Sequence, residues 1–425
     1  MDQHCPHLKT KANPCDDDLT YCCKDRDGRE YDNAQQCQGD PRRCVASQPP
    51  AITILGADGY LGWSAVQYFR SKGWRVSGID NGLRRIVVEE SGGDSLTPIL
   101  SWRERTEEAD ADLVGVDMRN YDQLRDHLAA HPPDAILHLA ELPSAPYSMR
   151  GPDECALTAE VNVVGSLNLL WAMREVCPEA HLIKLGTMGE YGVPPWDIPE
   201  GWATLTHRGR EARVFTPFDP GSLYHATKCA DSINIRKCCD WWGFRSTDIM
   251  QGPVYGIRTS ATGSTSPTRL DYDEAFGTAI NRFVVQALVD YPLTVYGEGG
   301  QTRGYLTLED SMEAMWLLAC NPPEQGEYRV ANQFVDWWTI NELAEAVRDA
   351  ARDELGKSVT ITSVPNPRVE QEQHYYAPIR EVLPSLGWEG TELREGIRRM
   401  IVDVAPFADR AIREVIAPTT NWRRG

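Results

Sequence analysis

The feature that most constrains the fold is a regular alternation of short apolar segments with helical stretches, beginning at Ala51. Apolar strands with little internal alternation indicate a sheet that is covered on both faces. Strands that alternate with helices indicate parallel order with right-handed crossovers. The chain therefore predicts an α/β fold built on a doubly wound parallel sheet. The predicted strands are 51–56, 75–80, 112–117, 135–140 and 181–186, and the helical stretches between them include 63–72 and 162–176.

The chain divides into three parts by its patterning. Residues 1–50 show no sustained periodicity and end in Gln48-Pro49-Pro50, so we expect an N-terminal extension and then a boundary. Residues 51–256 hold the alternating pattern. From 257 the pattern loosens into a loop rich in Thr, Ser and Gly, followed by helices, short strands and many prolines. We expect residues 257–425 to form a smaller, mixed α/β domain.

The overall charge and hydropathy exclude some classes of partner. With 62 acidic and 43 basic residues the formal net charge is -19, and such a surface repels the phosphate backbone of nucleic acids. A nucleotide ligand is still compatible with this net charge, because backbone dipoles can bind a phosphate locally. No apolar run reads as a membrane span, and the first residues lack the apolar core of a secretory signal. We expect a cytoplasmic protein without a membrane partner.

Half of the twelve cysteines lie in the N-terminal extension. Together with His4 and His7 they could bind zinc, but paired Cys-x-x-Cys spacings are missing. The alternative is an arm of reduced thiols that covers a partner subunit. No metal site is predicted firmly, and the cysteines concerned are Cys5, Cys15, Cys22, Cys23, Cys37 and Cys44.

A glycine-rich turn follows the first predicted strand, in the string Gly56-Ala-Asp-Gly59-Tyr60-Leu61-Gly62. Glycine is needed where the chain turns tightly and where a diphosphate approaches the backbone. The helix that follows offers unpaired N–H groups to phosphate oxygens. A strand before the turn and a helix after it favour a Rossmann-type dinucleotide site.

An acidic residue, Asp80, closes the second predicted strand. A carboxylate there accepts hydrogen bonds from the adenosine ribose hydroxyls and repels a 2′-phosphate, so NAD is favoured over NADP. Arg84 and Arg85 weaken this preference, unless they belong to a solvated basic turn. Asp117, at the end of the third strand, is either a contact to adenine or a helix cap.

Tyr224 and Lys228 lie four positions apart, so a helix places both on one face. A Lys ammonium near a Tyr hydroxyl stabilises the phenolate and lowers its pKa. The phenolate can then accept a proton from a sugar hydroxyl as hydride leaves. Thr187 closes the fifth strand, where its hydroxyl can bond the same sugar hydroxyl or satisfy local backbone instead.

The spacing Gly-x-x-Gly-x-x-Gly resembles that of extended short-chain dehydrogenases, the NAD-dependent epimerase/dehydratase family. Longer strings narrow the resemblance to the UDP-sulfoquinovose synthase branch, from about Ile52 to the end. These strings include DGYLGW (58–63), SAPYSM (144–149), KLGTMGEYG (184–192), QGPVYG (251–256), GGQTRGY (299–305) and VPNPRVEQEQHYY (364–376).

The resemblance implies a chemistry on UDP-glucose. NAD oxidises C4, the resulting ketone acidifies the C5 hydrogen, and loss of that proton with the C6 hydroxyl gives an unsaturated ketone. Sulfite then adds at C6 and the hydride returns to C4. Thr187, Tyr224 and Lys228 would carry the redox steps, in a homodimer that packs two helices of each subunit, at about 161–177 and 222–242.

Acid–base groups for C5 and C6 are less evident. Most sugar-nucleotide dehydratases have an Asp-Glu pair after this Thr, whereas Met188 and Gly189 stand here, as in the sulfoquinovose synthases. Glu190 and His225 are the candidates for this role.

The substrate diphosphate should meet positive charge. Arg303 is the first candidate, because a guanidinium grips phosphate through two donors. Arg282, Gln301 and Arg368 are further candidates, and a surface ion pair is the competing role for each. We also expect NAD contacts beside the motifs above, from Asn81, Met118, Leu139, Ala140, Glu141, Asn162, Gln251 and Val254.

One departure from the family bears on the sulfite step. The family typically has Glu-Gln-Arg before SAPYSM, and this chain has Glu141-Leu142-Pro143. The change removes a cation that could anchor an anion such as sulfite. The alternative function is therefore a sulfite-independent dehydratase or epimerase of antibiotic-sugar biosynthesis, acting on a hexose or longer nucleotide sugar. A non-enzymatic NAD sensor or scaffold is the third hypothesis.

Overall fold

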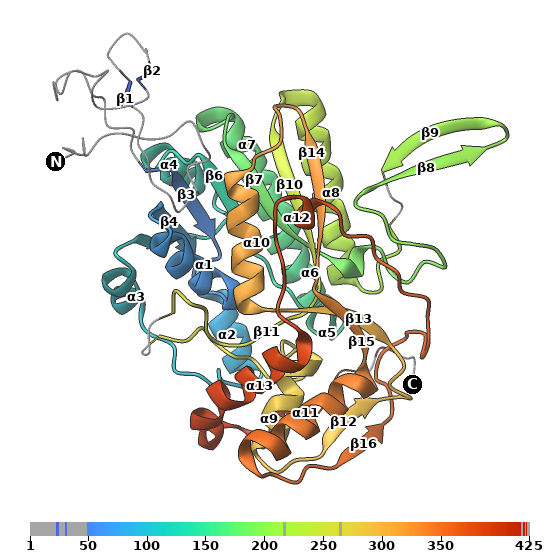
Figure 1. Ribbon diagram of the computed structural model, residues 1–425. Coiled ribbons are helices and arrows are strands. Elements are labelled where there is room, and N and C mark those ends of the chain that lie inside the picture. The colour runs from blue at the N-terminus through green and yellow to red at the C-terminus, as the bar shows by residue number, and fades with distance from the viewer. Residues whose placement is uncertain are drawn as a thin grey trace.

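A seven-stranded parallel sheet forms the centre of the computed structural model (Figure 1). The structure describes residues 49–417 except 216–217 and 263–265, with 420, 422 and the short paired strands β1 (Cys23–Lys24) and β2 (Glu30–Tyr31). The strand order is β14-β10-β7-β6-β3-β4-β5, so the chain starts in the middle and winds outward in both directions. The predicted doubly wound α/β fold is confirmed. The strands are β3 (Ala51–Leu55), β4 (Arg75–Asp80), β5 (Asp112–Gly115), β6 (Ala135–His138), β7 (His181–Thr187), β10 (Arg245–Gln251) and β14 (Tyr328–Gln333).

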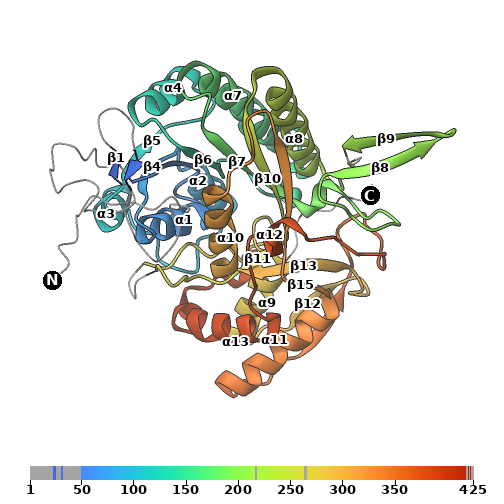
Figure 2. The same ribbon diagram turned by 45° about the horizontal axis from the view of Figure 1, so that its top comes forward.

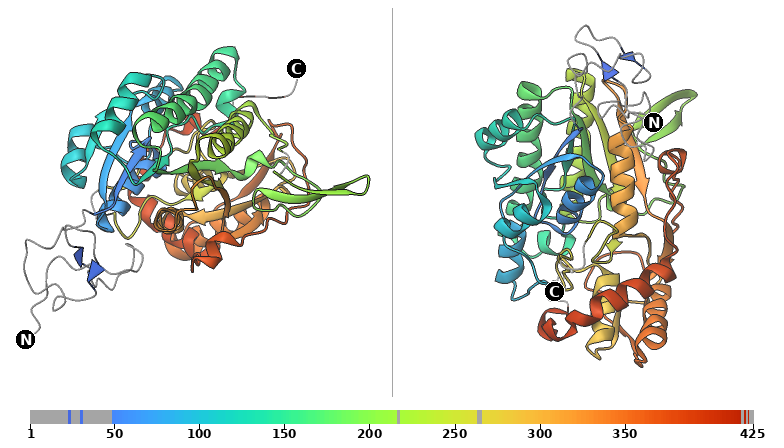
Figure 3. Two further views of the ribbon diagram at one scale, coloured as in Figure 1. Left: turned by 90° about the horizontal axis from the view of Figure 1, so that it is seen from above. Right: turned by 60° about the vertical axis from the view of Figure 1, so that its left-hand side comes forward.

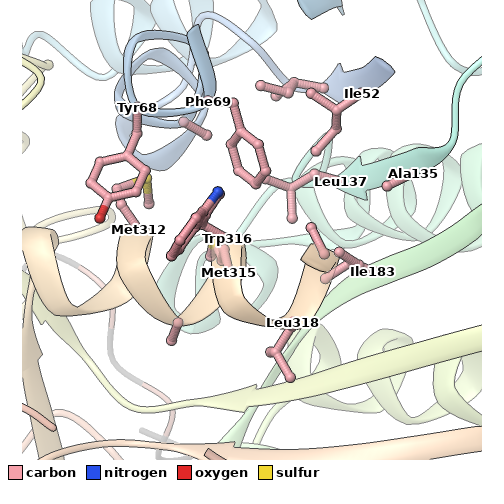
Figure 4. Packing of buried hydrophobic residues seen from close by; sticks show 14 of the residues in the cluster. Ile52, Tyr68, Phe69, Ala135, Leu137, Ile183, Met312, Met315, Trp316 and Leu318 are labelled. Atoms are coloured by element: carbon pink, nitrogen blue, oxygen red, sulfur yellow. The ribbon is translucent and has the colours of Figure 1, made fainter. Parts of the chain in front are cut away.

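Helices cover both faces of this sheet (Figure 2). One layer contains α4 (Tyr121–Ala130), α7 (Gly165–Val176) and α8 (Leu223–Trp242), and the other contains α1 (Tyr60–Ser71) and α10 (Leu308–Cys320). Successive residues of a strand point to opposite faces. Ile54 packs with α1 and α10, for example, while Leu55 packs with α4 and α7. Figure 4 shows the α1–α10 side, where Phe69, Met315 and Trp316 meet Leu137 of the sheet.

The C-terminal part has its own core and flanks the carboxyl ends of the strands. Its sheets are β11-β13-β15 and β12-β16, and its helices pack together around buried aliphatic and aromatic side chains. Its elements are β11 (Val254–Tyr255), α9 (Ala279–Leu288), β12 (Leu293–Tyr296), β13 (Thr302–Thr307), β15 (Asp336–Thr339), α11 (Ile340–Leu355), β16 (Ile361–Val364) and α13 (Leu393–Val404).

The expected boundary at residue 256 differs from the structure in one respect. After β13 the chain returns to the first layer, where α10 covers the central sheet and β14 forms its edge. Leu383 and Trp388 also pack into that core, beside the short helix α12 (Val382–Ser385). Strand pairing joins residues that are far apart in sequence. The local pattern alone therefore could not assign α10, β14 and the segment around α12 to the domain of the central sheet.

A long hairpin, β8 (Trp202–His207) and β9 (Arg210–Phe215), projects from the body of the molecule (Figure 3). Arg208 and Gly209 connect its strands, and both have positive φ, 49° and 74°. Such a two-residue turn matches the twist of paired strands. The sequence pattern did not predict this hairpin, because most of its side chains face solvent and show no core face.

One helical stretch, Pro152–Val176, passes a length and composition test for a membrane span, contrary to the expectation that no run would. It comprises α6 (Pro152–Ala159), a π-helical turn (Glu160–Val164) and α7, and 44% of its most apolar window is buried. In the structure this stretch packs against α4 and α8 as part of a layer on the sheet. The buried apolar side chains of this stretch therefore contribute to the core between the helices and the sheet.

The six N-terminal cysteines, for which zinc binding and an arm of reduced thiols were the two possibilities, lie outside the residues whose side chains are described. Within the described part of the chain, no group of three His, Cys, Asp or Glu side chains could hold a metal ion. Among the described residues, Cys155, Cys177, Cys229, Cys238 and Cys239 carry free thiols.

Candidate active site

A cavity of about 630 Å³ lies at the carboxyl ends of the sheet strands, between the sheet and the C-terminal part. Ligands of open α/β sheets bind at this edge, because the loops that follow the strands diverge there. Residues after β3, β4, β6, β7 and β10 form one wall. Residues of α9 and β13, together with the irregular segment 368–376, form the other.

The glycine turn has the geometry of a phosphate cradle. Gly56 has φ of 87°, and a Cβ there would lie 2.7 Å from the backbone of Leu139. A Cβ on Gly62 would lie 1.9 Å from the Gly56 carbonyl oxygen, so α1 can approach the turn this closely only with glycine. Gly59 is the N-cap of α1 and has no side chain that could cap the helix. The first N–H groups of α1 are therefore free to bind an anion.

The two arginines after Asp80 are held by other carboxylates. Arg85 donates two hydrogen bonds to Asp58, which also accepts from Arg105 at 2.6 Å. The backbone N–H of Asp58 donates to Asp80 Oδ2 at 3.0 Å. Arg84 lines the cavity and pairs with Asp271 at 2.7 Å, whereas Arg85 does not line it. Arg85 thus braces the glycine turn, which corrects its assignment as a cofactor contact and removes one cation that would favour NADP.

Asp80 titrates in an accessible range. Burial, and then the like charge of Asp58, raises the pKa of Asp80 to about 6. The carboxylate is the form that accepts from ribose hydroxyls. We expect the affinity of the ligand-free protein for NAD to fall as the pH is lowered through about 6, because Asp80 then becomes protonated. Calorimetric titration at pH 5 and pH 8 checks this, and Asp80→Asn should bind weakly with no such dependence.

Asp117 lies at the end of β5, on the cavity wall. It accepts from Asn81 at 2.9 Å and pairs with Arg119 at 2.7 Å, and the Arg119 hydrogen bond is the main cause that lowers the pKa of Asp117 to about 2. Asn120, rather than Asp117, caps α4. The structure therefore favours the ligand-facing role over the helix cap.

Thr187, Tyr224 and Lys228 all line the cavity. Ser222 caps α8, which places Tyr224 and Lys228 on its first turns, and Thr187 ends the neighbouring β7. Lys228 Nζ donates to the Leu185 carbonyl and to the Glu141 carboxylate. Burial, then the charges of Glu141 and Glu190, raises the pKa of Tyr224 well above its usual value.

His225 also faces the cavity, close to the turn after Thr187. Its Nδ1 lies 2.9 Å from Ser222 Oγ, and a Cβ on Gly189 would lie 2.4 Å from its Nε2. Burial, then the nearby charges of Arg368 and Arg303, lowers the pKa of His225 to about 3. A neutral imidazole thus occupies the space that glycine at position 189 leaves open.

We expect Gly189→Ala to lower turnover by about 10²-fold, because the new methyl group displaces the imidazole or the Thr187 turn by about 1 Å. Steady-state kinetics measures the effect. Gly115→Ala is the control, since a Cβ there meets nothing within 4 Å. Full activity of Gly189→Ala contradicts a role for the close approach of His225.

Two predicted site residues lie behind the cavity wall. Glu190 is fully buried, accepts from the Thr187 backbone N–H at 3.1 Å and pairs with Lys184 at 3.1 Å. It caps its own turn and offers no oxygen to a substrate, so its assignment as an acid or base is corrected. Asn162 accepts from Leu142 N and donates to Thr227 Oγ1, both at 2.9 Å. It fixes the loop after β6 and does not contact the cavity, which corrects its assignment to NAD.

The remaining predicted contacts are on the wall. For NAD these are Gly56, Gly59, Tyr60, Leu61, Gly62, Asp80, Asn81, Arg84, Asp117, Met118, Leu139, Ala140, Glu141, Gln251 and Val254. For the substrate they are Arg282, Gln301, Arg303 and Arg368. Arg282 donates to Tyr296 at 2.8 Å and Arg303 to Glu370 at 2.8 Å.

Several polar atoms on the wall have no hydrogen-bond partner among the described residues. They include Arg84 Nη1, Gln301 Oε1, Asn281 Oδ1 and Tyr305 Oη. Buried polar groups are normally paired, so these atoms indicate a polar ligand. Asn281 and Tyr305 were missed from the sequence, because nothing in the local sequence marks a side chain that tertiary packing leaves unpaired. Leu142 and Pro143 form an apolar part of the same wall, near Phe276.

Comparison with known proteins decides the family. The model of the NAD dependent epimerase/dehydratase family matches residues 52–332. The chain belongs to this family. It is 46% identical to the UDP-sulfoquinovose synthase of Sulfolobus acidocaldarius, over 88% of this chain and 98% of that protein. It is 41% identical to the chloroplastic UDP-sulfoquinovose synthase of Spinacia oleracea, over 88% and 79%. The resemblance predicted from the sequence motifs is confirmed, and with it NAD as the family's cofactor.

Solved structures share the fold at low identity. A UDP-glucuronic acid 4-epimerase from Bacillus cereus, in complex with UDP-glucuronic acid and NAD, matches with a TM-score of 0.65 and 20% identity, over 84% of this chain and 99% of that one. The UDP-glucose 4-epimerase of Thermotoga maritima, solved with UDP-glucose, matches with a TM-score of 0.63 and 20% identity, over 83% and 98%.

Proposed function

We propose that this family member transforms a UDP-linked hexose through a transient 4-ketone, with NAD reduced and reoxidised in one turnover. The observation that carries the proposal is one continuous cavity that joins the glycine turn, the Thr187–Tyr224–Lys228 set and the arginines of the C-terminal part. The C-terminal part is the proposed nucleotide-sugar domain. The two relatives at 46% and 41% identity are named UDP-sulfoquinovose synthases, which supports this substrate class.

The cofactor end of the cavity fits NAD. Its glycine turn leaves room for a diphosphate that any Cβ would fill. Asp80 ends β4 on the cavity wall, which supports a role as the ribose acceptor. Bound NAD supplies the acceptor and the donor of a hydride. In this proposal the Thr187 hydroxyl orients the sugar hydroxyl, and Tyr224 Oη accepts its proton and later returns it. Arg282, Arg303 and Arg368 hold the diphosphate at the far end.

His225 is the proposed acid–base group for the carbon next to the ketone. It is neutral, it lines the cavity beside Thr187, and Gly189 leaves it space. Glu190, the other candidate, is engaged by Lys184. A neutral imidazole can accept a carbon-bound proton that a ketone has made acidic and can then donate it to a leaving hydroxyl.

Sulfite is the proposed co-substrate, supported by the names of the two relatives. Leu142 and Pro143 make one part of the wall apolar, so an anion there must be held by other groups, and Arg84 Nη1 is an unpaired donor on the same wall. The sulfite-independent dehydratase or epimerase is the alternative that this apolar patch favours.

One incubation separates these functions. UDP-glucose, NAD and sulfite are mixed with the enzyme in deuterated water, and products are followed by mass spectrometry. A sulfonated nucleotide sugar that requires sulfite supports the main proposal. Deuterium incorporation without sulfonation supports the alternative. Unchanged UDP-glucose without isotope exchange contradicts both and leaves the non-enzymatic hypothesis.

A homodimer is proposed through α7 and α8. Val164, Leu167, Trp171 and Ile233 project from this helix pair, and each keeps 39–48% of its surface exposed. Exposed apolar residues grouped on neighbouring helices are typical of an interface. Trp171→Glu should give monomers in sedimentation velocity, whereas Leu205→Glu on the exposed hairpin should leave the dimer intact. A wild-type protein that sediments as a monomer contradicts the proposal.

The cytoplasm is the proposed location, since NAD and nucleotide sugars are both present there. The spinach relative is named as chloroplastic. Cell fractionation with an antibody to the protein tests the location directly, and recovery in an organelle or membrane fraction contradicts it.

A further inference from the structure

Glu141 lies in the catalytic cavity and contacts the catalytic lysine. It follows β6, its side chain is 3% exposed, and its Oε2 accepts a hydrogen bond from Lys228 Nζ. Its other oxygen, Oε1, is buried without a hydrogen-bond partner among the described residues. A buried carboxylate with one free acceptor, beside a catalytic ammonium, is a costly arrangement that calls for a function.

The contact bears directly on Tyr224. The ammonium of Lys228 favours the phenolate through its positive charge, and a carboxylate bonded to that ammonium cancels much of this effect. Burial opposes the phenolate most, and the charge of Glu141 is the next largest influence that raises the pKa of Tyr224. In the ligand-free protein these two influences outweigh the nearby positive charges of Lys184 and Arg84.

The neighbouring titratable groups do not offset Glu141. His138 of β6 lies 3.8 Å from Oε1, is bonded to Ser166, and is neutral because burial lowers its pKa to about 4. Burial, and then the charge of Glu141, raises the pKa of Asp231 on α8 well above its usual value. The remaining charged or titratable groups around the pair are Lys184, whose ammonium is paired with Glu190 and Asp248, and Arg84 and His225 on the cavity wall.

We propose that Glu141 is a positioning residue for the catalytic pair: it holds Lys228 against the end of β7 and balances the charge of its ammonium until a ligand engages the free oxygen of Glu141. This inference rests on the proposed function. Oε1 is an acceptor suited to a hydroxyl such as that of a ribose, and a cationic ring beside the carboxylate is stabilised by it. Either contact reduces the hold of Glu141 on Lys228, so the base becomes active only when the site is filled.

The test compares Glu141→Gln with the wild type in two measurements. The first is the pH dependence of kcat/KM, which reports the ligand-free enzyme. Its acidic limb should move down by about one pH unit, because the variant removes the charge that opposes the phenolate. The second needs no sugar. Binding of NAD⁺ and of NADH is titrated separately, and the preference for NAD⁺ should fall about tenfold, since the variant lacks the carboxylate that favours the cationic ring.

Glu141→Asp retains the charge, and it should restore part of both effects. Glu175→Gln, at an exposed position near the end of α7, is the control for a general change of charge. Lower turnover of Glu141→Gln with an unmoved acidic limb and an unchanged NAD⁺/NADH preference overturns the proposal, because that is the signature of a merely structural contact. If no sugar is turned over even by the wild type, the proposed function fails, while the binding measurement still decides the role of Glu141.

Discussion

Tyr224→Phe lowers turnover by about 10²–10⁴-fold, the range expected for loss of a general acid–base group. The substitution removes one oxygen and keeps the aromatic ring, which is buried on the first turn of α8. Binding of NAD should change little, because the glycine turn and Asp80 stay intact. Single-turnover measurement of hydride transfer, followed by nicotinamide absorbance, isolates the step concerned.

Tyr147→Phe is the matched control for Tyr224→Phe. Tyr147 is buried in a neighbouring cluster against Phe276, and its side chain does not contribute to the cavity wall. Its loss of a hydroxyl should leave turnover near the wild-type value. Equal activities of the two variants would falsify the assignment of Tyr224 as the base, and with it the redox part of the proposed function.

Lys184→Met lowers the free energy of unfolding by about 3–5 kcal/mol, the cost of leaving buried charges without their partner. Lys184 is fully buried, and its Nζ lies 3.1 Å from Glu190 and 3.3 Å from Asp248. Burial lowers the pKa of Lys184, but these two carboxylates outweigh it and the pKa is raised, so the side chain is charged. Urea denaturation followed by circular dichroism measures the change.

The same substitution should also impair catalysis. Lys184 Nζ donates to the Lys228 carbonyl at 3.2 Å and holds Glu190, which caps the turn that carries Thr187. One ammonium therefore ties β7 to α8 behind the catalytic residues. Lys357→Met, which removes a surface pair with Asp290, is the control and should not shift the denaturation midpoint measurably. An unchanged midpoint for Lys184→Met contradicts the role of this buried network.

Local sequence signals predicted the central strands and much of the catalytic set. Short apolar strands are marked by composition, and Tyr224 with Lys228 by a spacing that one helix converts into a shared face. Glu190 shows the limit of such signals. It is three positions from Thr187, yet its side chain turns inward and caps its own turn. This orientation depends on the ion pair with Lys184, which is buried in β7.

Contacts between segments that are distant in sequence could not be predicted from such local signals. Arg85 braces the glycine turn because α2 (Leu83–Glu90) brings it to Asp58, and no residue type or spacing indicates this. Glu141 was expected among the cofactor contacts, but its bond to Lys228 joins β6 to α8 across the sheet edge. Such pairings follow from the tertiary arrangement and could not be read from neighbours in sequence.

The return of α10 and β14 to the central sheet has a mechanical consequence. The chain passes from one side of the cavity to the other after β10, before α10 and again after β14, and α12 ties the later segment back to β14. Several covalent and packed connections thus span the cleft, and a single hinge cannot swing the two halves apart. We expect ligand exchange to involve local displacement of the irregular segment 368–376, which lines the cavity. We also expect that neither half folds when it is expressed without the other.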